Sequence, residues 1–313
     1  MASYVARRAV TAAFTLLVAT ALAYSAMLLV PGDPARAILG MEADPQAVAA
    51  LQRQLGLDRP PLERFGRWLA GVVRGDLGQS LRYQRPVAEL VGQRLALTVP
   101  LVAASLAVAG LAALVLGVAA ATRPDTGADL AVRLGALVGG SLPTFWIGLM
   151  LILLFSVRWG MLPSGGFSGW QDPLRAAREL ALPVATLALA RTPLLARMVR
   201  AGLLESLEQP YIRTARAKGL GEGRVVLRHA LRNALIPVLT VLGLEFSQLL
   251  VAGVVVESVF ALPGLGTLAL VAIEARDYPL VQGVVLVLAA FIVAVNLAVD
   301  LLYAAVDPRV AHP

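Results

Sequence analysis

The longest apolar segment of the chain, Leu95–Ala121, runs for 27 residues without one charged side chain. A helix that crosses the hydrocarbon core of a bilayer needs about 20 predominantly apolar residues. A second segment, Pro279–Val299, is also free of charge. Inside a bilayer a chain of this kind satisfies its backbone hydrogen bonds by forming helices. The two segments therefore predict an all-α polytopic membrane protein.

Composition supports this class. Hydrophobic residues make up 58% of the chain and charged residues only 15%, against about 25% charged in a typical soluble domain. The net charge is +7, from 26 Arg, one Lys and 20 acidic residues. In a soluble protein that excess would suggest nucleic acid, but cytoplasmic loops of membrane proteins are enriched in Lys and Arg, so no nucleic-acid partner is expected. The chain has no cysteine, which excludes disulfides and thiolate chemistry.

Six segments are long and apolar enough to span a membrane. The first is too long for a signal-peptide core, and no small-residue cleavage site follows it, so it is interpreted as a retained helix anchored inside by Arg7 and Arg8. Two of the spans are interrupted by a charge, at Arg191 and at Glu245. The predicted spans are Ala9–Val30, Leu95–Ala121, Leu134–Val157, Leu180–Val199, Leu235–Val256 and Pro279–Val299.

The distribution of basic residues predicts the orientation. With the N-terminus in the cytoplasm, the inside segments hold 13 Lys and Arg residues and the short outside loops hold 4. The remaining outside loop, about residues 31–94, is longer than 60 residues, and loops of that length translocate largely regardless of charge. Both termini are therefore expected in the cytoplasm of a bacterium, with the protein in its cytoplasmic (inner) membrane.

The long extracytoplasmic loop after the first span is expected to be structured. Asp44 suits a helix N-cap, Pro45 the first helical position and Gly56 the helix end. A second stretch, PPLERFGRWLAGVV, places Leu62, Phe65, Trp68 or Leu69, and Val72 on one face. Two short amphipathic helices follow from these patterns. We divide the chain into residues 1–94, the first span with this region, and residues 95–313, a five-helix core.

A basic segment, YIRTARAKGLGEGRVVLRHALRNALIP, separates the fourth and fifth spans at residues 211–237. Pro210 and Gly219 suit the start and the end of a helix Tyr211–Lys218, with Tyr211 and Ala215 on one face. A break at Gly221–Gly223 and a second basic helix, Arg224–Asn233, are expected after it. A short cytoplasmic helix held between rigid spans is suited to docking into a groove on another protein.

At this point the sequence resembles a known family. The segments YIRTARAKGL and RHALRNALIP are similar to the cytoplasmic coupling loop of binding-protein-dependent ABC importer permeases, in particular the dipeptide, oligopeptide and nickel group. The resemblance continues along the chain in YVARRAV, PGDPA, LGLDRP, GDLGQSL, SLPTFWIGLMLILLFSV, VVVESVFALPGLGTL, ARDYPLVQG and NLAVDLLYAAVDPRV. One departure is that the general Glu-Ala-Ala motif reads Arg213-Thr214-Ala215 here, without the acidic residue.

The resemblance implies a permease subunit of an ATP-driven importer that translocates di- or oligopeptides, with nickel-chelate or another small solute as the alternative. It implies a homologous second permease, two ATP-binding subunits and an extracytoplasmic substrate-binding protein as partners, besides membrane lipid. ATP and Mg would be held by the partner subunits, and this chain would bind no cofactor and no metal. The residues implied in coupling to the ATPase are Tyr211, Arg213, Thr214, Ala215, Arg216, Lys218 and Gly219.

The residues independently argue against an enzyme. The single lysine, Lys218, is not preceded by a P-loop pattern, so nucleotide use has to come from a partner. No HExxH and no recognisable Ser/His pair is present, and His229 has no second His nearby. The basic residues of the loop also have a simpler interpretation, as orientation signals or as contacts to anionic lipid.

Arg191 and Glu245 lie about mid-span, and ionisable residues at that depth point to function. They could line a translocation path, because a peptide carries both a carboxylate and an ammonium group. They could equally form a structural ion pair between adjacent helices, or Arg191 could pair with the partner permease. Two rival classes are an ion-gradient-driven secondary transporter and an assembly protein without transport. The first would predict an inverted repeat and several intramembrane carboxylates, and neither is visible.

Overall fold

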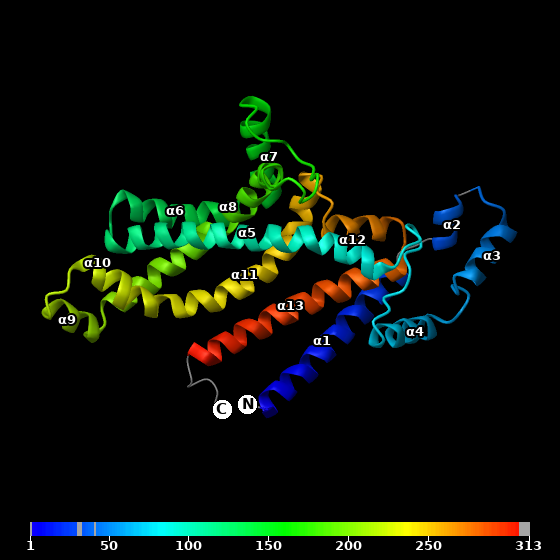
Figure 1. Cartoon of the computed structure of the whole chain (residues 1–313), viewed down its shortest axis with the longest axis horizontal. Coiled ribbons are helices and arrows are strands. Elements are labelled where there is room, and N and C mark those ends of the chain that lie inside the picture. The colour runs from blue at the N-terminus through cyan, green and yellow to red at the C-terminus, as the bar shows by residue number, and fades with distance from the viewer. Residues whose placement is uncertain (1, 30–32, 41, 307–313) are drawn as a thin grey trace. The chain divides into compact units, whose positions relative to one another are not determined.

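The computed structural model describes residues 2–29, 33–40 and 42–306, which form helices joined by loops. Val30, Pro31 and Gly32, at the predicted exit of the first span, lie outside the described residues, and so does His312. Helices of spanning length and apolarity are α1 (Ala2–Leu29), α5 (Val87–Thr122), α8 (Pro173–Leu207), α11 (Leu231–Val259) and α13 (Tyr278–Val306). The predicted all-α membrane architecture is confirmed (Figure 1).

The third predicted span, Leu134–Val157, differs from a straight helix. It is built from α6 (Gly127–Ser141), α7 (Thr144–Leu151) and a π-helical stretch, Ile152–Arg158, with a bend of 104° between the two halves. The bend falls at Leu142 and Pro143, both in extended conformation. A residue before proline is disfavoured in the α region, which explains why the helix ends there. The bent pair counts as a sixth span if its halves are taken together.

One helix was missed from the sequence. The loop predicted between the fifth and sixth spans contains α12 (Leu265–Glu274), whose residues Leu265, Leu268 and Ala272 are buried. Its apolar residues follow a helical period, but ten residues are too few for a span. A segment of this length falls below the span threshold, so from the sequence it is expected to lie in an outside loop.

The chain divides into two compact units, and each is described separately. Unit 1 comprises residues 1–97 and 263–294. Besides α1, α12 and parts of α5 and α13, it holds α2 (Pro34–Leu39), α3 (Pro45–Gln54) and α4 (Pro61–Val73). Its core joins Met27 of α1, Val87 and Val91 of α5, Leu268 of α12 and Leu280 of α13.

The two helices predicted in residues 31–94 are present as α3 and α4. The Asp44 carboxylate accepts the backbone N–H of Gln46 at 3.2 Å, which confirms the N-cap, and Gly56 follows the helix at a φ of 65°. In α4, Phe65 stacks on Tyr24 of α1 with ring centroids 5.3 Å apart. Leu62, expected on the same face as Phe65, is 82% exposed, so that face is buried only in part.

Unit 2 comprises residues 98–262 and 295–313 and contains the basic segment. Helices α8 and α11 pack together, and α6 and α7 pack on α8. Glycine permits the close approach of α6: a Cβ on Gly139 would lie 2.6 Å from the ring of Pro193 in α8. At one end of this unit, Figure 1 shows α9 (Pro210–Ala217) and α10 (Glu222–Arg224) together with the turn between α5 and α6.

Candidate coupling surface and intramembrane charges

The predicted coupling helix is α9, Pro210–Ala217. Proline occupies its first turn, and Gly219 follows it with a φ of 76°, a conformation that favours glycine. The start and end expected from Pro210 and Gly219 are both present. The break after the helix falls at Lys218–Gly221, because α10 already begins at Glu222 and so takes Gly223 into the helix.

The inward face of α9 differs from the expected one. Ile212 is fully buried and Ala215 nearly so, and both pack in an apolar cluster with Leu203, Val225 and Ala230. Tyr211, expected beside Ala215, is 40% exposed. Ile212 and Ala215 are three residues apart, so they lie on the same face of the helix. The apolar side chain of Ile212 was the signal in the sequence that this face points inward.

The outward face of α9 carries the other residues implied in coupling. Of the seven residues implied in coupling, only Ala215 faces the protein interior. The six exposed residues are Tyr211, Arg213, Thr214, Arg216, Lys218 and Gly219. The Tyr211 hydroxyl accepts a hydrogen bond from Asn233 Nδ2 of α11 at 2.9 Å. Beside this contact is a hollow of about 290 Å³, lined by residues that include Glu205 and Gln209.

A short ion pair closes the turn after α9. Arg216 Nε donates to Glu222 Oε1 at 2.6 Å, and both side chains are exposed. The Arg216 guanidinium holds the pKa of the Glu222 carboxyl below its usual range, mainly through this hydrogen bond. The pair links the end of α9 to the start of α10 across the Lys218–Gly221 break.

The second basic helix, expected at Arg224–Asn233, is continuous with the fifth span. Residues Val225–Ala230 are π-helical and lead directly into α11 (Leu231–Val259), with Pro237 inside that helix. Val225, Val226 and Ala230 are buried in the cluster that also holds Ile212. Helix α9 is therefore packed against the π-helical stretch and the start of α11.

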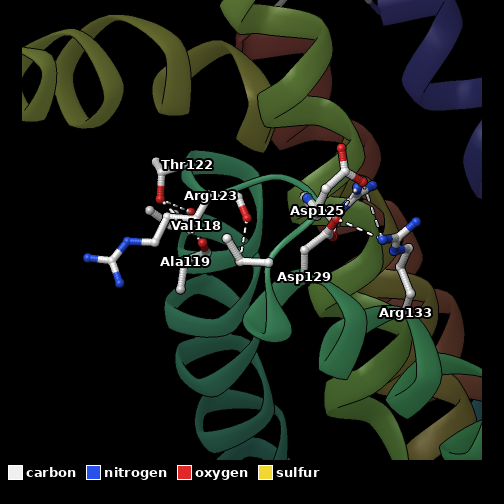
Figure 2. Close-up of polar contacts among 9 residues, drawn as sticks. Val118, Ala119, Thr122, Arg123, Asp125, Asp129 and Arg133 are labelled. Atoms are coloured by element: carbon white, nitrogen blue, oxygen red, sulfur yellow. Dashed lines mark hydrogen bonds and ion pairs between the residues drawn. The ribbon is translucent and has the colours of Figure 1, made fainter.

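A polar cluster that sequence reasoning missed ties α6 to α8 near the same end of unit 2. The Asp129 carboxylate is fully buried and accepts hydrogen bonds from Arg200 Nε and, at 3.0 Å, from Arg200 Nη2. Figure 2 shows Arg133 and Asp125 around it: Arg133 Nη2 lies 3.2 Å from Asp129 Oδ2, and the Asp125 N–H donates to the same oxygen at 3.0 Å. Asp129 and Arg133 are four residues apart at the start of a helix, and this spacing was the signal in the sequence for the contact between them.

The two mid-span charges are brought together. Arg191 Nε of α8 lies 3.4 Å from Glu245 Oε2 of α11, with the Glu245 side chain 8% exposed and that of Arg191 25% exposed. Neither of these two atoms has a hydrogen-bond partner among the described residues. The two side chains therefore form an ion pair without a hydrogen bond between these atoms. Arg191 Nε and Glu245 Oε2 both remain available to a third polar group. Among the described residues no group of His, Cys, Asp and Glu side chains is arranged to hold a metal ion.

Several apolar helices of spanning length, with an exposed basic helix between two of them, define a polytopic membrane protein. Comparison with family models specifies the class. Residues 113–312 match the binding-protein-dependent transport system inner membrane component, and residues 1–102 match the N-terminal part of such a membrane component. The chain belongs to this family. It is an ABC importer permease of the peptide group, and ATP is hydrolysed by partner chains of such importers.

Its relatives are aligned over their full lengths. A peptide transport system permease protein of Brucella suis biovar 1 (strain 1330) is 43% identical over 313 residues, all of both chains. The glutathione transport system permease protein GsiC of Salmonella paratyphi A is 41% identical over 315 residues, again covering both chains. A chain of the MetNI methionine ABC transporter in inward-facing conformations shares the fold, with a TM-score of 0.58 and 21% identity over 70% of this chain and 96% of that one.

Proposed function

We propose that this chain imports di- or oligopeptides across the bacterial inner membrane in an ATP-driven complex. The observation that carries the proposal is the sequence identity of 43% and 41%, over the full length of both chains, to permeases named for peptide and glutathione transport. Glutathione is itself a small peptide, so both names describe one chemical class of substrate. Nickel chelates remain the alternative within the family resemblance.

The complex would contain a second homologous permease, two ATP-binding subunits and an extracytoplasmic binding protein. In the proposed orientation both termini and α9 lie in the cytoplasm and α3 and α4 lie outside. The basic residues support this orientation, since the segment from Arg197 to Arg232 alone carries eight of them.

Coupling to ATP would pass through α9. Its exposed face, with Arg213, Arg216 and Lys218, would bind an ATPase subunit, while Ile212 and Ala215 would transmit its movement to α11 through the apolar cluster. A buried side chain cannot contact a partner, so the role we assign to Ala215 is to hold the helix in place. Asp129 and Arg200 would keep α8, which leads into α9, fixed to α6 during that movement.

The Arg191–Glu245 pair is proposed to line the translocation path. A peptide carboxylate could bind Arg191 and an ammonium could bind Glu245, because the ion pair leaves Nε and Oε2 without hydrogen bonds. The structural alternative is that the pair only joins α8 and α11. The pattern of variants described in the Discussion separates the two.

The experiment is peptide uptake into proteoliposomes that contain the complete transporter with its cognate binding protein. Uptake that requires ATP inside and is stopped by vanadate supports the proposal. Uptake that survives ATP depletion and collapses with the proton gradient would identify a secondary transporter. A complex that assembles but transports no peptide would indicate an assembly protein. Uptake of a nickel chelate but not of peptide would show that the substrate is the chelate.

A further inference from the structure

A pocket in unit 1 has no role in the proposed transport cycle. It has a volume of about 220 Å³ and is lined by residues of α1, α4 and α13 together with the loop after α3. Three of its walls are the aromatic rings of Tyr24, Trp68 and Tyr278. All of these residues belong to the same compact unit, so the pocket is a feature of that unit alone.

Two nitrogen donors in the pocket lack acceptors. Gln282 is only 3% exposed, and its Nε2 has no hydrogen-bond partner among the described residues. Arg64 Nε is also buried and without a partner there. Buried N–H groups are almost always paired, so two orphaned donors beside one cavity indicate that an acceptor is missing from it. A ligand oxygen that enters the space between them would supply it.

The charge of Arg64 specifies an anion. Its guanidinium carbon lies 5.6 Å from the ring centroid of Tyr278 and 6.0 Å from that of Tyr24. None of the ion pairs seen among the described residues includes Arg64, and the nearby Glu63 is engaged by Arg67. The aromatic rings hold the guanidinium in place without neutralising it. Arg67 also lines the pocket, and it shares Glu63 with Arg59, so the pocket is positively charged. This charge, together with the two free N–H donors, suits a phosphate or carboxylate oxygen.

The depth of the pocket distinguishes between these anions. Tyr24 is near the end of the span Val10–Leu29, and Tyr278 is the first residue of the span Tyr278–Val299. Their hydroxyls donate to Pro61 O at 2.9 Å and to Met27 O at 3.4 Å, which fixes both rings where the two spans end. Tyrosine and tryptophan concentrate at the level of lipid headgroups.

Helix α4, which supplies Arg64 and Trp68, has the character of a helix lying on a membrane surface. Its apolar residues Leu62 and Val73 are 82% and 84% exposed, at opposite ends of the helix. An amphipathic helix at a membrane interface turns such side chains toward the acyl chains. A pocket at this level meets phosphodiester groups of phospholipids at far higher local concentration than any soluble anion.

We infer that this pocket binds the phosphate of a phospholipid headgroup, with Arg64 and Gln282 donating to its oxygens and Tyr24, Trp68 and Tyr278 enclosing it. The orientation proposed above assigns the lipid to the outer leaflet. The binding chemistry does not depend on that orientation or on peptide transport. Bound lipid would hold α4 against α1 and α13.

The test is native mass spectrometry of the delipidated complete transporter titrated with phosphatidylglycerol. We expect a lipid adduct on the native protein above the non-specific background. Arg64→Gln should weaken the apparent affinity of the transporter for phosphatidylglycerol about tenfold or more, as expected for loss of a charge-assisted hydrogen bond. Gln282→Met should weaken that affinity severalfold. Arg74→Gln is the matched control, because it removes an exposed positive charge just after α4 and outside the pocket, and should bind as the native protein does.

Three results would overturn the inference. The native protein could show no lipid adduct above background. This result would contradict the inference even if a variant failed to assemble. Arg64→Gln and Gln282→Met could bind lipid as well as Arg74→Gln does. Finally, glycerophosphoglycerol or a short peptide with a free carboxylate could bind Arg64 as tightly as the lipid, which would make the pocket a site for a soluble anion. Peptide uptake is measured separately, so failure here is distinguishable from failure of the proposed function.

Discussion

Arg200 of α8 donates two hydrogen bonds to the buried carboxylate of Asp129, 71 residues earlier in the chain. Arg200 lies about two turns before the end of α8, the helix that precedes α9, and Asp129 stands in the first turn of α6. The pair therefore joins the bent third span to the helix that leads into α9. Arg133 reinforces it from the next turn of α6, so the carboxylate faces two guanidinium groups (Figure 2).

Asp129→Asn should destabilise the protein, because it leaves Arg200 beside a neutral amide where a carboxylate had compensated its charge. We expect the melting temperature of the purified transporter to fall by roughly 5 °C or more, measured by thermal unfolding. Asp125→Asn is the matched control, since the Asp125 side chain is 90% exposed and its ion pair with Arg133 is 3.6 Å long. Equal shifts in the two variants would show that the buried pair contributes nothing special.

Reversing the charge of α9 should uncouple the transporter while leaving its fold intact. Arg213 and Lys218 are exposed, so Arg213→Glu with Lys218→Glu should lower ATP-driven peptide uptake about tenfold or more without changing the melting temperature. Deleting Tyr211–Gly219 should abolish coupling. Normal uptake in either variant would remove the coupling role of this helix.

Ala215→Asp should also uncouple, but for a different reason. The new carboxylate would enter an apolar cluster in which Ala215 is only 7% exposed, and burying an unpaired charge displaces the helix. This variant should therefore change the protease sensitivity of the 210–224 segment, whereas the Arg213/Lys218 variant should not. Identical proteolysis of the two would contradict the assignment of Ala215 to the inward face.

The Arg191–Glu245 pair is tested with Arg191→Ala, Glu245→Gln and the double variant. If the pair lines the path, each single change should raise the KM for peptide severalfold, and the double change should not restore it. If it only joins α8 and α11, the single changes should lower thermal stability, with a coupling of about 0.5–3 kcal/mol in the double-mutant cycle and an unaltered KM. Unchanged KM and stability in all three would make both residues bystanders.

The Arg216–Glu222 pair predicts a pH dependence of the coupling loop. Because the pKa of Glu222 is lowered in the folded protein, the pair contributes order above the ordinary glutamate pKa and loses it as the pH falls through the lowered value. The protection of residues 211–218 against hydrogen exchange, corrected for the slower intrinsic exchange at low pH, should fall under acid in the native protein, whereas Glu222→Gln should show no such fall. The same pH profile in both proteins would show that the pair does not order the loop.

Two adjacent glycines in α6 should respond differently to substitution. A Cβ on Gly139 would meet the Pro193 ring at 2.6 Å, whereas one on Gly140 would have nothing within 4 Å. Gly139→Ala should therefore cost about 1–3 kcal/mol of stability and Gly140→Ala very little. Thermal unfolding of the two variants is the measurement, and a larger effect at Gly140 would contradict the packing of α6 on α8.

Most of the helices could be predicted because they depend on local properties of the chain, but α2 and α12 were not predicted, and α5 and α8 begin before the predicted spans. Apolar length located the spans, Asp44 with Pro45 located the start of α3, and Pro210 with Gly219 bounded α9. The bend of the third span at Leu142 and Pro143 also has a local cause, in the steric effect of proline on the preceding residue. That segment was nevertheless expected to be a single span, because length and apolarity carry no information about direction.

Which side chains meet depends on how the helices pack in three dimensions. Asp129 with Arg200, and Arg191 with Glu245, are separated by many turns of helix, and no sequence period relates their positions. That packing also decided that Ile212 faces inward where Tyr211 was expected, and that Arg64 and Gln282 converge on one pocket. Most of the helices, the membrane class and the basic segment can be predicted from the residues alone, because these follow from local propensity and hydrophobic length. The pairing of distant side chains follows from the way rotations and tilts of packed helices fit together, which no local pattern specifies.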